Sequence, residues 1–407
     1  MSIATDPPHQ ELVDLPHGAP SGCPYAPPPA MADLRSSGPL TKVRLPDGTW
    51  TWLATSYELV REIIAHPSFS ASPQSPGFPS WNLPGGLDLP LNMTQADPPV
   101  HTQMRKMSAG EFTLKRINEL RPDIERITDE RCAAIEALPQ PFDFVDNFAT
   151  PIPASVICLM LGVPQDEYAY FVRRIRLVLA HDDLDSAERQ QAKLELLQYM
   201  LNLIEVKRAE PDSRLLSRLI VENPELDPVE LVSYACSLLL AGFATTAHMI
   251  ELSTLTMIER PDIAARVRAD RSILPELVEE LLRYHSVVRD SPRRAALADV
   301  ELGGVTIRAG EGVIASVQAA NWDDEAFPRP DEIDADRPRT RRSLAFGHGI
   351  HACIGALLAK AELEIALERI VTRYPDISLA VPRSEVRFRT TTHLHGCYEL
   401  PVDLRLR

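Results

Sequence analysis

Apolar side chains recur every three to four residues along most of the chain, which is the spacing of one helix face. Strand-like runs flank the turn residues Asp47 and Gly48 between Val43 and Ala54, and this pattern predicts a β-hairpin. The expected fold class is therefore mainly α with a small β region. The predicted helices cover residues 57–65, 114–138, 153–161, 165–179, 187–209, 227–258, 275–284 and 356–373, and a further helix opens at residues 97–105.

The longest predicted helix has a well-marked start. Asp227 can cap it, Pro228 occupies the first helical position, and Glu230 stands where the acid of a capping box belongs. The pattern continues to Ile258, which at about 1.5 Å per residue gives a length of roughly 45 Å. Such a helix is long enough to cross a whole domain.

Two stretches have no regular pattern. Residues 1–36 are rich in proline and polar residues, which predicts an extended leader on the surface, whereas residues 37–407 contain no linker or repeat and predict one domain. Residues 71–96 hold five prolines and three glycines and predict a long loop, of the kind that is usually functional. Its apolar residues Trp81 and Leu83 either line a pocket or pin the loop to the core.

Composition narrows the possible partners and location. The 44% hydrophobic content supplies a core, and a formal charge of -15 argues against nucleic acid or an anionic membrane as partner. Six scattered cysteines form no disulfide framework. The sequence opens with no export signal, and we expect no apolar run of 18 residues, so the predicted location is the cytoplasm.

Candidate chemistry gathers in the stretch from Phe346 to Gly355. Its glycines permit turns and close approaches suited to a flat macrocycle, and Cys353 lies at the start of the helix over residues 356–373. The helix dipole and backbone N–H groups there favour a thiolate, so Cys353 is a candidate iron ligand. We interpret the other cysteines as buried apolar residues, and zinc is disfavoured because the chain has no paired CxxC and no HExxH motif.

The stretch from Phe346 to Gly355 resembles the haem-binding loop of cytochromes P450, and the resemblance extends from His101 to the last residues with five motifs in the family's order. It implies the P450 fold, in its soluble bacterial form, with haem b between the long central helix and the cysteine loop. Glu280 and Arg283 resemble the family's ExxR pair, which Arg337 would complete as a lock on the loop. The resemblance further implies that Cys353 binds iron, that Phe346 and Gly355 contact the haem, and that its propionates meet His101, Arg105, Arg294 and His351.

Residues 241–246 of the long helix resemble the oxygen-binding segment of these enzymes. Ala241 would line the pocket, and Thr245 matches the threonine that holds dioxygen and a relay water. The preceding position is commonly acidic in the family but is Ala244 in this chain, and a methyl group cannot relay protons. His248, one turn beyond, either replaces the acid as a proton relay or packs against a neighbouring helix.

Two further segments match pocket walls of the family and are unusually polar. The first contains Val288, Arg289 and Asp290, and the second contains Thr392 and His393. They favour a substrate with charge or hydrogen-bonding groups, such as an amino acid, a peptide or a phenolic compound. Alternatively, Arg289 and Asp290 pair with each other and face away from the pocket.

The resemblance implies a monooxygenase that hydroxylates or epoxidises a small-molecule secondary metabolite with dioxygen and external electrons. A ferredoxin and a ferredoxin reductase would supply those electrons, because no flavin or iron-sulfur segment is fused to the chain. The alternatives are oxidative aromatic coupling without oxygen insertion and a haem sensor that does not turn over. A basic patch for the ferredoxin, or else ordinary surface, is predicted at Lys106, Arg116, Arg339, Arg341 and Arg342.

Overall fold

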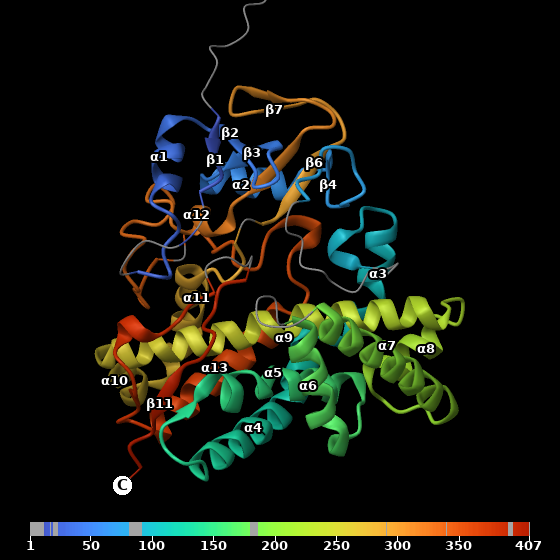
Figure 1. Ribbon diagram of the computed structural model, residues 1–407, viewed down its shortest axis with the longest axis vertical. Coiled ribbons are helices and arrows are strands. Elements are labelled where there is room, and N and C mark those ends of the chain that lie inside the picture. Colours follow the sequence, from blue (N-terminus) through green and yellow to red (C-terminus); the bar gives the residue numbers. More distant parts are fainter. Residues whose placement is uncertain are drawn as a thin grey trace, which may run out of the picture.

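The computed structural model describes residues 12–16, 18, 23–80, 92–179, 186–289, 291–338, 340–389 and 394–406. A large helical body lies beside a smaller β-rich part, and helix α9 runs across the middle of the molecule (Figure 1). The helices are α1 (Ala30–Ser37), α2 (Tyr57–Ala65), α3 (Val100–Ala109), α4 (Leu114–Glu136), α5 (Pro151–Leu161), α6 (Tyr168–Leu179), α7 (Ser186–Ala209), α8 (Leu215–Glu222), α9 (Pro228–Glu259), α10 (Pro261–Ala269), α11 (Leu274–His285), α12 (Val317–Asn321) and α13 (Ala356–Arg373).

The strands are short and form three sheets. The largest has the order β1-β2-β3-β9-β6-β4, the second has the order β10-β11-β5, and the third is the pair β7-β8. The predicted hairpin is confirmed, since β2 and β3 pair antiparallel around a turn in which Gly48 has a φ of 85°. The strands are β1 (Val13–Asp14), β2 (Leu40–Arg44), β3 (Trp50–Ala54), β4 (Phe69–Ser70), β5 (Phe142–Asp143), β6 (Arg293–Ala296), β7 (Val300–Leu302), β8 (Val305–Ile307), β9 (Gly312–Ala315), β10 (Ser378–Leu379) and β11 (Pro401–Asp403).

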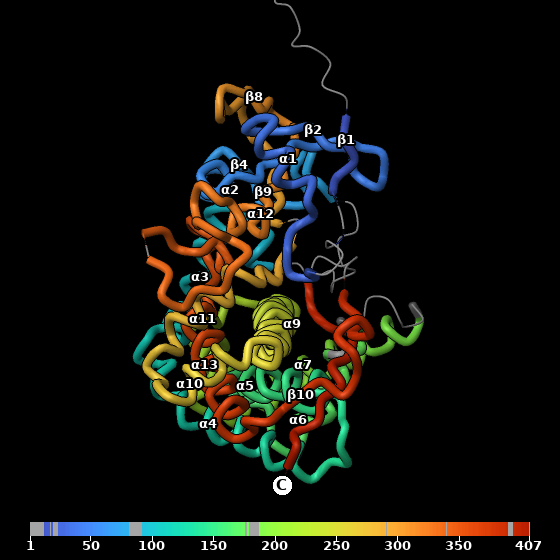
Figure 2. The backbone as a smooth tube through the Cα atoms, turned by 90° about the vertical axis from the view of Figure 1, so that its left-hand side faces the viewer, coloured from blue at the N-terminus to red at the C-terminus, as the bar shows by residue number. Residues whose placement is uncertain are grey.

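Helix α9 begins as the sequence predicts. The Asp227 side chain accepts from the N–H of Glu230, and the Glu230 carboxylate accepts from the N–H of Asp227, which completes the capping box. Seen end-on in Figure 2, α9 lies in the centre, with other helices and the C-terminal strands around it. The helix therefore carries residues from one side of the molecule to the other.

The expectation of no apolar run of 18 residues is wrong. Helix α9 contains an 18-residue window with a mean hydropathy of 1.4, which is long and apolar enough to cross a bilayer. Of that window, 61% is buried inside the fold. An apolar helix at the centre of a large domain meets protein on most of its surface, and this position accounts for its composition.

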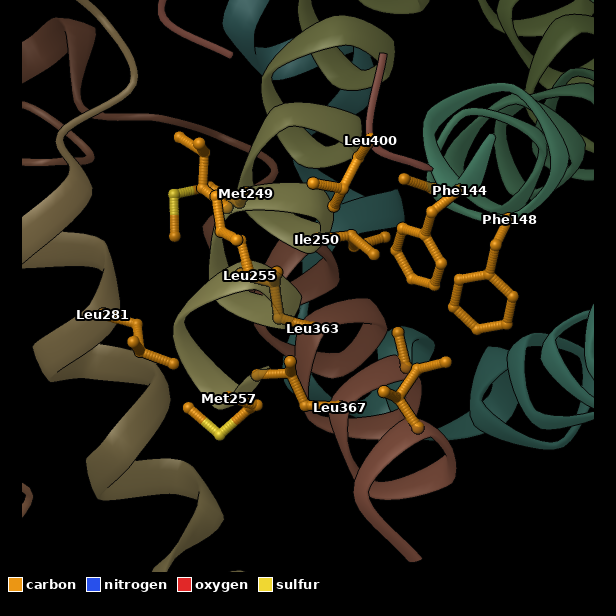
Figure 3. Packing of buried hydrophobic residues seen from close by; sticks show 14 of the residues in the cluster. Phe144, Phe148, Met249, Ile250, Leu255, Met257, Leu281, Leu363, Leu367 and Leu400 are labelled. Atoms are coloured by element: carbon orange, nitrogen blue, oxygen red, sulfur yellow. The ribbon is translucent and has the colours of Figure 1, made fainter. Parts of the chain in front are cut away.

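Two large apolar clusters hold α9. One surrounds its N-terminal half with residues of α4 to α8, and the other surrounds its C-terminal half with residues of α11 and α13. Figure 3 shows part of the second cluster, where Met249, Ile250 and Leu255 of α9 lie near side chains from other elements, namely Leu281, Leu363, Leu367, Phe144 and Phe148. This packing fixes the helix on which the candidate oxygen-binding residues lie.

The prediction of an extended leader is wrong for its last part. Residues 30–37 form helix α1, and β1 pairs in parallel with β2 at the sheet edge. Met31 and Leu34 are three positions apart, so they share one helix face and bury it against Val43 and Leu53. The high proline content of the segment led the sequence analysis to miss this short amphipathic helix.

Candidate functional site

The cysteine loop makes two tight turns that require glycine. Gly347 and Gly349 have φ values of 69° and 75°, in the left-handed region. A β-carbon at Gly349 would lie 2.9 Å from the Cα atom of Ala65, so α2 packs directly on this turn. The loop then closes on itself, because the N–H of Cys353 donates to the carbonyl of Phe346 at 2.8 Å.

The side chain of Cys353 is accessible although protein surrounds it. It is exposed by area, yet burial among the surrounding protein atoms raises the pKa of its thiol. The N–H of Gly355 and the charge of Arg105 act in the opposite direction. The backbone hydrogen bond therefore has the sign that the sequence predicts, although desolvation is the larger effect on the thiol.

Most of α9 is buried, but a row of four residues along its middle is accessible. We call these residues, Ser237, Ala241, Thr245 and His248, the α9 stripe. Successive members are three or four positions apart and so lie on one face. Near the middle of the stripe, the Thr245 hydroxyl donates to the carbonyl of Ala241 at 2.9 Å. Helix α13, which follows the cysteine loop directly, packs against α9.

The four predicted propionate contacts lie together at one end of the loop. The rings of His101 and His351 are 4.2 Å apart, and Arg105 donates to the carbonyl of Ala352 at 2.8 Å. Among the described residues, neither nitrogen of the buried His101 ring has a hydrogen-bond partner. Arg294 is also buried, on strand β6.

The negative group of this cluster is the carboxylate of Asp97. Burial, followed by Arg294, lowers the pKa of His351 to about 3, and burial, followed by Arg105, lowers the pKa of His101. Burial also lowers the pKa of Arg294 to about 10, and Asp97 acts on all three groups. The two imidazoles with Arg105 and Arg294 form a site suited to a dianion.

The predicted lock behind the loop is confirmed. Glu280 accepts two hydrogen bonds from Arg283, at 2.9 and 2.8 Å, and two from Arg337, at 3.0 and 3.1 Å. Arg283 also donates to the carbonyl of Asn321, whose side chain accepts from the N–H of Leu344 at 2.8 Å. The lock is thereby tied to the residues that lead into the cysteine loop.

These residues fit haem b. The accessible Cys353 would hold the iron through its sulfur, and the cationic cluster with the unpartnered imidazole of His101 would hold the two propionates. The described residues contain no group of three or more His, Cys, Asp or Glu side chains that could hold a bare metal ion. The cationic cluster agrees with a macrocycle that carries two carboxylates.

Comparison with known proteins decides the family. The family model described as Cytochrome P450 matches residues 35–377. The chain belongs to the cytochrome P450 family. Over 96% of its length it is 38% identical to Cytochrome P450-SU2 of Streptomyces griseolus, of which 97% is covered. The P450 MoxA of Nonomuraea recticatena is a similar solved structure, with a TM-score of 0.91, 37% identity, and coverage of 97% of this chain and 99% of the other.

A second solved P450, GfsF, gives a TM-score of 0.90 at 36% identity and covers 96% of this chain and 99% of its own. The predicted fold, the haem b cofactor and the class of oxidoreductases that use dioxygen are thus confirmed. P450 enzymes hold haem iron through a cysteine thiolate.

The structure describes only part of the predicted substrate pocket. Val288 forms an isolated β-bridge with Leu394, so the two predicted wall segments meet. Arg289 is buried and donates to the carbonyl of Pro24 at 2.8 Å, which directs one of its donors to the N-terminal segment. The predicted residues Trp81, Leu83, Asp290, Thr392 and His393 lie outside the described residues.

Some residues of the predicted basic patch pair with acidic side chains. Arg116 is paired with Glu111 and Glu119, and Arg341 with Glu58, whereas Lys106 and Arg342 are exposed. Arg339 lies outside the described residues.

Two acidic residues of the site were missed by the sequence analysis. Asp97 was noted only as the start of a helix, although it stands four positions before His101. Glu251 accepts a hydrogen bond from His248, three positions away on α9. In both cases the short spacing on one helix face was the available signal.

Proposed function

We propose that this P450 inserts one atom of dioxygen into a small-molecule secondary metabolite, by hydroxylation or epoxidation. The observation that carries the proposal is the accessible Cys353 side chain before α13, a helix that packs against α9, which carries the accessible Thr245. A binding protein without turnover needs a haem ligand but has no need of a threonine hydroxyl on the facing helix.

The proposal assigns roles to the residues of the site. Cys353 would bind the iron, with Phe346 and Gly355 supporting it through the loop carbonyl and the N–H near the sulfur. His101, Arg105, Arg294 and His351 would hold the propionates. When bound, the haem supplies the activation of dioxygen, and the chain supplies orientation, exclusion of water and protons.

The relatives favour a largely apolar substrate without fixing its identity. One relative is named Vitamin D3 dihydroxylase, at 38% identity, and another is named Pentalenic acid synthase, at 39%. A solved neighbour, CYP105P1, holds filipin I. Aromatic coupling is not favoured, and the hydrogen bond from Arg289 to Pro24 weakens the argument for a charged pocket.

Electrons would come from a ferredoxin and its reductase in the cytoplasm. Lys106 and Arg342 remain exposed as possible contacts for an acidic partner.

Turnover with isotopically labelled dioxygen tests the proposal. A panel of neutral terpenoids and macrolides, together with tyrosine peptides, is first screened for a Soret shift of the ferric protein. Compounds that bind are then incubated with ferredoxin, reductase and ¹⁸O₂. We expect a product that has gained one labelled oxygen atom. A product that has lost two hydrogens without label would establish coupling instead, and binding without any product under reducing conditions would contradict an enzymatic role.

A further inference from the structure

The proposed reaction consumes protons, and the position next to Thr245 cannot provide them. Insertion of one oxygen atom into a C–H bond uses one dioxygen, two electrons and two protons, and releases one water. Ala244 is buried and ends in a methyl group. The protons must therefore come from another group that reaches the site.

His248 is the titratable member of the α9 stripe. It follows Thr245 by three positions, so the two side chains lie on the same helix face. The imidazole side chain remains 14% exposed, while its Nδ1 atom lies 3.0 Å from Oε1 of Glu251, which is fully buried. The ring thus lies between the accessible face of α9 and a carboxylate inside the protein.

Glu251 is a fully buried hydrogen-bond acceptor. Its Oε1 atom also accepts the N–H of Cys397 at 2.5 Å, and its Oε2 atom has no hydrogen-bond partner among the described residues. A buried carboxylate without an arginine or lysine partner is costly, because its charge is poorly compensated. In the described part of the chain, the groups that meet it are the N–H of Cys397 and Nδ1 of His248.

The C-terminal segment leaves room for the pair. A β-carbon at Gly396 would lie 2.3 Å from Nδ1 of His248 and 2.4 Å from Oε1 of Glu251. Two neighbours in this segment are neutral: burial, followed by Arg289, lowers the pKa of His395, and burial, followed by Glu251, raises the pKa of the Cys397 thiol. The carboxylate in contact with His248 is that of Glu251. The other charges that act on this segment are Arg289, Arg383, Arg389 and Asp143.

We propose that His248, oriented by Glu251, delivers the protons for oxygen reduction through the Thr245 side of the site. This inference rests on the proposed oxygenase function. With Nδ1–H donated to Glu251, the other nitrogen, Nε2, exchanges protons. In each of two transfers an N–H bond at Nε2 breaks, an O–H bond forms on the oxygen that leaves as water, and the ring regains a proton from solvent. The ferredoxin supplies the electrons.

Infrared spectroscopy of the reduced carbon monoxide complex tests the position of His248 without turnover. A positive charge or a donated proton near the carbon monoxide oxygen lowers its stretching frequency, so we expect the band of the unmodified protein to depend on pH. His248→Asn should abolish this pH dependence, and Glu251→Gln should alter the band, because the carboxylate that orients the imidazole is gone. The control His66→Asn changes a histidine at the end of α2 and should keep the dependence.

Coupling of electrons to product provides the second readout. We expect His248→Asn to divert several-fold more electrons to hydrogen peroxide than the unmodified protein or His66→Asn. A pH-independent band in the unmodified protein, or equal peroxide yields in all variants, would overturn the role of His248. These results differ from failure of the proposed function, in which the unmodified protein would form no oxygenated product at all.

Discussion

At the scale of single residues, burial sets the charge of several groups that the sequence leaves undefined. His285 is fully buried at the end of α11, with Nε2 3.1 Å from the Thr256 hydroxyl and no partner for Nδ1 among the described residues. Burial, followed by the charge of Arg283, lowers the pKa of His285 to about 3. The folded protein therefore keeps this imidazole neutral in mildly acidic solution.

His285 should make the free energy of unfolding depend on pH. Below about pH 6.5 the unfolded chain binds a proton at this residue, whereas the folded chain does so only near pH 3. Because the unfolded state then binds more protons, stability falls as the pH falls through this window, by about 1.4 kcal/mol per unit from this residue. Denaturant unfolding at several pH values gives the free energy of unfolding as a function of pH, and His285→Gln should make this pH dependence shallower. The same pH dependence in both proteins between about pH 4.5 and 6 would contradict the prediction.

The site residues differ in how far the sequence reveals them. Cys353, His101 and Arg294 stand in short motifs, so they could be named before the structure was known. The environment of Glu251 could not be predicted, because its backbone donor, Cys397, is 146 residues away in the chain. Hydrogen bonds of this kind depend on the packing of distant segments and leave no local pattern.

At the scale of elements, the lock between α11 and the residues before the cysteine loop determines whether the haem site forms. Glu280 and Arg283 are nearly fully buried, and Arg337 is largely so. Removing one partner of a buried ion pair leaves the other charges uncompensated, although the complete network adds little net stability.

Glu280→Gln should therefore destabilise the protein by about 3–5 kcal/mol and speed the loss of haem. Urea unfolding and transfer of haem to an excess of apomyoglobin measure the two effects. Arg266→Gln is a matched control, because it breaks the exposed pair of Arg266 and Asp336 and should cost no more than about 1 kcal/mol. Equal effects of the two substitutions would show that the lock does not act as described.

Long helices were predicted better than short strands. The helices over 57–65 and 356–373 match α2 and α13 at both ends, because their apolar spacing is regular and their boundaries are marked. Strands β6 and β9 have four residues each, and β9 pairs with the distant strand β3. So short a segment has too few positions to establish a period of two.

At the scale of the whole molecule, the N-terminal segment belongs to the folded body. Met31 is only 1% exposed and packs with Val43 and Ile314, and Arg35 bridges to Asp323 at 3.5 Å. The described part of this segment closes one edge of the largest sheet.

Met31→Ala should lower the free energy of unfolding by about 2–5 kcal/mol, because a fully buried side chain leaves a cavity. Leu12→Ala, at a position that is 41% exposed, should change it by less than about 0.5 kcal/mol. Thermal or urea unfolding of both variants measures the difference. Similar stability for the two would mean that the segment is a loosely attached leader after all.

The central claim is that Cys353 holds haem iron, and the absorption spectrum of the dithionite-reduced carbon monoxide complex tests it most directly. We expect the unmodified protein to show the red-shifted Soret band of a thiolate ligand, and Cys158→Ala, a change at a buried cysteine of α5, to keep it. Cys353→His should still bind haem but lose the red shift. Survival of the red-shifted band in Cys353→His, or its absence from the haem-loaded unmodified protein, would contradict the claim.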